Sequence, residues 1–148
     1  MALHETLKTW LAILALGGAM MLGSQQSAAA GPDSRPVVNI HCTLTGSAKS
    51  AAGLTRAAVC ARFARTIETA LKVRLVETAT APGPKGRWIA IQVKLGVPAH
   101  AEAAFSSRLG RSVRNHQSLG IDVMDKPLDL REIDMLARQV AEVLRKAG

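Results

Sequence analysis

The alternation of apolar and polar positions predicts strands along most of the chain after residue 36. Between Val37 and Leu44 every second residue is apolar, which is typical of a strand with one buried face. The same period is clearest between Trp88 and Val97, where five isoleucine, valine and leucine residues share one face. Strands are predicted over 37–44, 72–78, 88–97, 101–109 and 118–124. The segment 110–117 is polar and ambiguous.

Two segments have apolar residues three and four positions apart, which indicates amphipathic helices. The first helix is predicted from Arg56 to about Leu71, with Thr55 as its N-cap. The second helix is predicted to begin after Asp129, which forms an approximate capping box with Glu132. Each helix therefore has one apolar stripe to bury.

The predicted order is β-α-β-β-β-β-α, which favours an α+β two-layer sandwich. Both helices are expected on one face of a mostly antiparallel sheet of about five strands. The first strand–helix–strand unit is compatible with a parallel crossover, and the turn at Ala81–Gly86 is expected to reverse the chain. The other sheet face is left for solvent or a partner.

The first 30 residues have the pattern of a secretory signal peptide. A weakly positive start precedes an uncharged apolar run from Trp10 to Gly23, and Ala28-Ala29-Ala30 supplies small residues for cleavage. The run is shorter than the roughly 20 residues that a bilayer span requires, so no stable membrane anchor is expected. We therefore predict cleavage near Ala30 and a single small domain over 31–148, periplasmic or secreted.

The only two cysteines are Cys42 and Cys60. Cys42 falls on the apolar face of the first strand and Cys60 on the apolar stripe of the first helix. If that helix packs on that sheet, both side chains point into one interface, and an oxidising compartment preserves disulfides. The sequence predicts a Cys42–Cys60 disulfide. Two free buried thiols are the alternative, and without a C-x-x-C motif a redox site is not expected.

The charge balance is strongly basic and gives the main functional signal. The chain has 19 Lys and Arg against 11 Asp and Glu, a net charge of +8, and the predicted signal peptide removes only Lys8 and Glu5. Positive residues of the sheet region are predicted to form a basic face that attracts anionic partners. We expect this face to contain Arg74, Lys94, Arg108, Arg111 and Arg114. The alternative is that these charges serve only solubility.

No established catalytic or metal motif is present. The histidines lack metal-ligand spacing, no G-x-S-x-G elbow occurs, and no phosphate-loop spacing is found, so neither metal nor cofactor is expected. Aromatic residues are too few for stacking on bases, which disfavours nucleic-acid binding. A catalytic site would have to be assembled from dispersed residues. The candidates for it are His41, His100, His116, Glu102 and Asp122.

Three hypotheses about function follow from these patterns. The first is a non-enzymatic exported binding or adaptor module that uses the basic face to contact an acidic envelope protein or another anionic envelope component. The second is a small periplasmic hydrolase or other enzyme built from the dispersed histidines and carboxylates. The third is an envelope protein that self-assembles by pairing exposed edge strands. The oligomeric state is left open.

Overall fold

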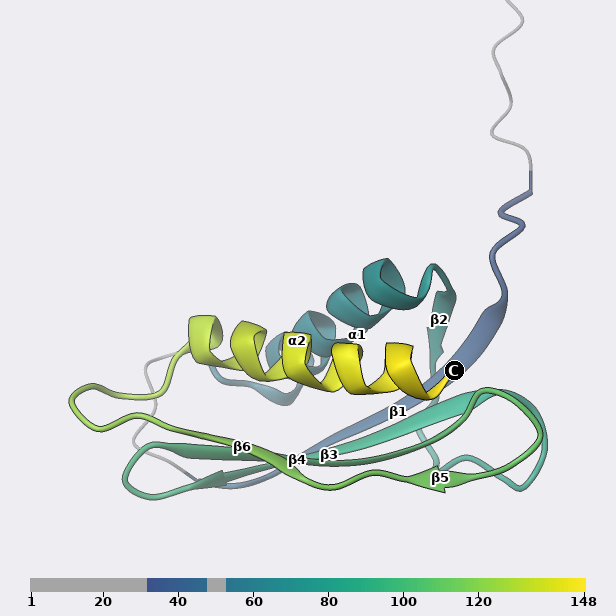
Figure 1. Cartoon of the computed structure of the whole chain (residues 1–148). Helices are drawn as coiled ribbons and strands as arrows, with labels where there is room; N and C mark the ends of the chain where they lie inside the picture. Colours follow the sequence, from purple (N-terminus) through teal and green to yellow (C-terminus); the bar gives the residue numbers. More distant parts are fainter. Residues whose placement is uncertain (1–31, 48–52) are drawn as a thin grey trace, which may run out of the picture. The chain divides into compact units, whose positions relative to one another are not determined.

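The computed structural model describes residues 32–47 and 53–148, and a compact unit covers 34–148 (Figure 1). The predicted signal peptide, residues 1–30, lies outside the described residues. Within the described part, no helix combines the length and apolar character needed to cross a membrane. The elements are β1 (Val37–Gly46), α1 (Arg56–Leu71), β2 (Arg74–Glu77), β3 (Trp88–Gly96), β4 (His100–Arg108), β5 (Arg114–Asn115), β6 (Leu119–Asp122) and α2 (Leu130–Ala147).

The α+β prediction is confirmed, and α1 and α2 lie on the same face of the sheet (Figure 1). The six-stranded sheet is mixed rather than purely antiparallel, and the parallel crossover expected for the first strand–helix–strand unit is present between β1 and β2. Its order is β2-β1-β3-β4-β5, with β6 also pairing with β4. β1 is parallel to both of its neighbours, whereas β4 is antiparallel to β3, β5 and β6.

The turn between β2 and β3 does not reverse the chain, which corrects the expectation of a reversal there. β2 is short and pairs only with Val37–Ile40, while β3 begins opposite Asn39. The loop 78–87 therefore has to cross β1 but does not have to change the strand direction. Two side chains of the sheet face opposite the helices hold this loop. His41 Nδ1 lies 2.9 Å from the Thr78 carbonyl oxygen, and Arg108 donates to the Gly86 carbonyl oxygen over 2.8 Å.

β5 and β6 form one interrupted edge strand beside β4. Ala103 pairs with Leu119 and Ser106 with Asn115, so two residues of β4 face three residues of the edge strand. One extra residue in a strand is a β-bulge, which bends the strand and disturbs its pairing. The bulge breaks the period of two, and for this reason the sequence pattern left 110–117 ambiguous and missed β5.

The core lies between the helices and the sheet, where the apolar stripes meet the apolar strand faces. Phe63, Ile89, Leu136 and Leu144 are fully buried there. Both predicted N-caps are confirmed: the Thr55 hydroxyl accepts from the Ala58 amide, and Asp129 forms a capping box with Glu132. These caps fix where each helix begins and hence which residues face the sheet.

The predicted disulfide is confirmed between Cys42 on β1 and Cys60 on α1. Both residues are buried, and their Cα atoms lie 5.8 Å apart. Arg56, in the first turn of α1, adds contacts at the same junction. Its Nε donates to the Cys42 carbonyl oxygen over 3.2 Å, and its guanidinium pairs with Glu77 of β2 at 3.0 Å. The disulfide therefore joins α1 to the sheet at a place where a hydrogen bond and an ion pair of Arg56 also connect them.

Candidate functional site

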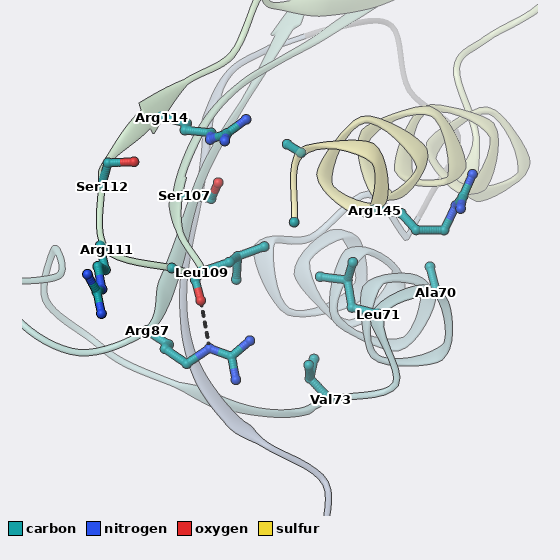
Figure 2. A pocket seen from close by; sticks show the side chains of 13 residues that line it. Ala70, Leu71, Val73, Arg87, Ser107, Leu109, Arg111, Ser112, Arg114 and Arg145 are labelled. Atoms are coloured by element: carbon teal, nitrogen blue, oxygen red, sulfur yellow. Dashed lines mark hydrogen bonds between the residues drawn. The ribbon is translucent and has the colours of Figure 1, made fainter.

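A cleft opens at the end of the domain where both helices finish (Figure 2). The last residues of α1 and α2 form one side of it, and the end of β4 with the 109–113 loop forms the other. Its volume is about 390 Å³, which lies within the range of small-molecule sites, roughly 300–1,000 Å³. The lining residues that matter for chemistry are Arg87, Arg111, Arg114, Ser107, Ser112, Leu71, Val73 and Leu109.

Three arginines of the sheet side give the cleft its positive charge. Arg87 precedes β3, and its Nε donates to the Leu109 carbonyl oxygen over 3.0 Å. Arg114 on β5 extends toward the end of α2 (Figure 2), and Arg111 belongs to the loop before it. Within residues 32–47 and 53–148, no carboxylate pairs with any of these three guanidinium groups. They are therefore available to an external anion.

The fourth arginine of the cleft, Arg145, is already occupied. It makes two hydrogen bonds to the Glu142 carboxylate, at 2.9 and 2.8 Å. These bonds, with help from Lys146, lower the pKa of the Glu142 carboxyl to about 2. Arg145 and Glu142 thus neutralise each other at the rim of the cleft.

The floor of the cleft combines apolar side chains with one buried hydroxyl. Leu109 contributes from the sheet side, and Leu71 and Val73 lie at and just after the end of α1 (Figure 2). Ser107 is 2% exposed, and its hydroxyl lies 2.9 Å from His116 Nε2. The His116 ring also stacks on Phe105, with ring centroids 4.9 Å apart. Burial lowers the pKa of His116, and the positive charge of Arg114 lowers it further, so the ring is neutral at pH 7.

The structure separates the five residues of the predicted basic face into different places. Arg74 and Lys94 lie on the sheet face opposite the helices, as does Arg108, which is engaged with the 78–87 loop. Lys94 pairs across the sheet with Glu102 and is six residues from the strand position opposite Arg108, about 20 Å. Only Arg111 and Arg114 line the cleft.

The five residues proposed for an enzymatic site are not gathered in one cleft. His100 Nδ1 contacts Asp122 Oδ1 at 2.8 Å, and Glu102 follows His100 on the same sheet face. His41 lies level with Ser106 of β4, about 20 Å along the sheet from His100. His116 stacks on Phe105 and contacts Ser107, and it lines a shallow hollow together with His41. Among the described residues, no group of three or more His, Cys, Asp or Glu could hold a metal ion.

Comparisons with known proteins add no function. No family model matches the chain, and no curated protein matches it. One solved structure, described as "Crystal structure of uncharacterized protein", is similar at a TM-score of 0.48 and 8% identity. The match covers 76% of this chain and 91% of that one. The site must therefore be argued from its own residues.

Sequence reasoning missed Arg87, Ser107 and Leu109 as members of a site. Arg87 ends a loop, and Leu109, predicted as the last residue of a strand, directly follows β4, so neither lies in a strand of the structure. The signal that could have found them is strand pairing: in an antiparallel β3–β4 pair, the start of β3 and the end of β4 are neighbours. The approach of both helix ends to this place is visible only in the tertiary structure.

Proposed function

We propose that this protein is a non-enzymatic, exported binding module that recognises anionic groups of an envelope partner at the arginine-lined cleft. The observation that carries the proposal is that Arg87, Arg111 and Arg114 all line one cleft whose lining contains no acidic side chain. Guanidinium groups bind carboxylates and phosphates through paired hydrogen bonds, so this arrangement suits such groups.

The disulfide supports the exported location. Bridges of this kind persist in the periplasm or outside the cell and are rare in a reducing cytosol. The apolar run before Ala30 agrees with that location, because it has the length of a signal peptide and falls short of a membrane span.

A simpler role for the arginines is to balance the negative ends of the two helices. A helix C-terminus carries a partial charge of roughly −0.5, so α1 and α2 together account for about one charge. Lys72 caps α1 and Lys146 lies in the last turn of α2, and both are nearer to those ends in sequence than the three arginines of the sheet side. A surplus of positive charge therefore remains for a ligand.

The other two hypotheses have weaker support. An enzyme would rest on two separate contacts, His100–Asp122 at 2.8 Å and Ser107–His116 at 2.9 Å, and His100 and Ser107 stand seven residues apart along β4. Self-assembly by edge strands would use β2, which has four residues, or the bulged β5–β6 edge. Short and bulged edges are the ones that proteins use to discourage such pairing. Both hypotheses remain predictions.

Binding of fluorescent poly-glutamate, followed by anisotropy at increasing salt, tests the proposed function. We expect affinity to fall as salt rises, because exposed charge contacts are screened. Exposed contacts contribute up to about 1 kcal/mol each, so the double variant Arg111→Gln/Arg114→Gln should bind roughly tenfold more weakly.

Lys94→Gln is the matched control, since it removes one exposed positive charge at a distance from the cleft. It should change the affinity less than twofold. If Lys94→Gln and Arg114→Gln lowered the affinity for poly-glutamate equally, binding would depend only on net charge and not on the cleft. Absence of poly-glutamate binding at low salt would refute the proposal.

A further inference from the structure

The cleft offers two kinds of surface side by side, and only one of them is explained by an acidic partner. The guanidinium groups of Arg87 and Arg114 stand at its edge. Leu109 lies beside them, and Leu71 and Val73 lie at and just after the end of α1 (Figure 2). A polyanion can satisfy the arginines, but it would leave the half-buried Leu71 and Leu109 in contact with water.

We infer that the ligand of this cleft is a small single-chain amphiphile, with a carboxylate or phosphate head on the arginines and an apolar tail against Leu71, Val73 and Leu109. This inference rests on the proposed function and names the chemistry of the ligand. Small-molecule sites are commonly concave and largely apolar, with a few placed polar groups, and this cleft follows that arrangement.

The head group has three sources of hydrogen bonds in the cleft. Arg87 uses its Nε for the Leu109 carbonyl, which fixes the side chain and leaves its terminal nitrogens free. The guanidinium group of Arg114 makes no hydrogen bond or ion pair within the described ranges and extends to the same side. Ser107 is a third source: when His116 donates from Nε2 to the serine oxygen, the serine hydroxyl hydrogen is free to bind a ligand oxygen.

An apolar tail is expected because the apolar side chains of the cleft are partly buried in a concave site. Val73 is 3% exposed, while Leu71 and Leu109 are half-buried and pack against the core. A tail covering the two leucines would remove apolar area from water, and the gain grows with each methylene group that is buried. A volume of about 390 Å³ between two helix ends accommodates one chain, which argues for a monomeric amphiphile rather than a membrane surface.

Calorimetric titration of the purified protein with three probes below their micellar concentrations tests this inference. Decanoate has both head and tail, butyrate has the head with a short tail, and decanol has the tail alone. We expect decanoate to bind at least tenfold more tightly than either of the others. Its addition should shift the methyl NMR signals of Leu71, Val73 and Leu109 more than those of other residues.

Two variants separate the inference from the proposed function. Arg114→Gln should weaken both decanoate and poly-glutamate, whereas Leu109→Ser should weaken decanoate at least fivefold and leave poly-glutamate within twofold. Thermal unfolding of Leu109→Ser checks that it folds, and the methyl shifts of the unmodified protein do not depend on any variant.

Each outcome decides between the two ideas. Binding of poly-glutamate without binding of decanoate overturns the amphiphile and leaves the proposed function standing. Binding of neither probe removes both. Decanoate shifts located elsewhere in the domain, or binding to phosphatidylglycerol vesicles without any decanoate shift, would likewise refute a ligand of this class in the cleft.

Discussion

Reduction of the Cys42–Cys60 bridge should destabilise the domain by about 3 kcal/mol. The two cysteines are separated by 18 positions, and closing a loop of that length removes this much entropy, expressed as free energy, from the unfolded chain. Domains have a stability of roughly 5–15 kcal/mol in total, so the loss is a large fraction. For a domain of this size it corresponds to a fall in Tm of about 12 °C.

The folded state itself should change little on reduction. Cys42 and Cys60 are 1% and 6% exposed, so two thiols can remain in the apolar interface without meeting water. The bonds of Arg56 to the Cys42 carbonyl and to Glu77 still hold α1 against the sheet. The loss of stability should therefore arise in the unfolded chain, which becomes free to expand.

Urea unfolding followed by circular dichroism, with and without a phosphine reductant, measures this effect. The protein must be reduced in urea first, because the buried bridge is shielded in the folded domain. We expect a lower midpoint and a larger m-value, since the unbridged chain exposes more surface. The double variant Cys42→Ala/Cys60→Ala is the control and should not respond to reductant. A loss below 1 kcal/mol with an unchanged m-value would refute the loop-entropy argument.

Three further predictions concern the pH dependence of stability, the 78–87 loop and the cleavage site. Because burial and Arg114 lower the pKa of His116, the unfolded chain binds the proton more readily, so stability should fall as pH drops below about 6.5; His116→Gln should flatten that part of a Tm–pH profile, and an unchanged slope would contradict it. Arg108→Gln should release the 78–87 loop, seen as faster hydrogen exchange around Trp88, while Arg111→Gln should not. Mass spectrometry of the exported protein should find Gly31 as the first residue, and an intact Met1 in the cytosol would overturn the predicted location.

Local chemistry explains which parts of the fold could be predicted. Thr55 and Asp129 begin helices because their side chains accept backbone N–H groups that have no partner in the first turn. The strand faces of β1 and β3 follow from a period of two, and the same periods placed both cysteines on facing surfaces. Each of these signals involves residues close together in the chain.

The partners of each strand could not be predicted in this way. A loop rich in glycine and proline has the same sequence pattern whether it reverses the chain or crosses a neighbouring strand. Here β2 is short and ends level with the start of β3, so the loop crosses β1 without reversing the chain. The extra residue between β5 and β6 likewise interrupts the period that would have shown one strand.

The sequence by itself determined the two helices and their first residues, the buried faces of the long strands, the disulfide and the excess of positive charge. The tertiary structure decided the parallel placement of β1 between β2 and β3, and it decided which arginines line the same cleft. Arg87, Arg111 and Arg114 do so because the start of β3, the end of β4 and the ends of both helices lie at one end of the domain. The number of positive residues in a sequence does not say which of them are close in space. The packing of the helices on the sheet decides which arginines line the cleft.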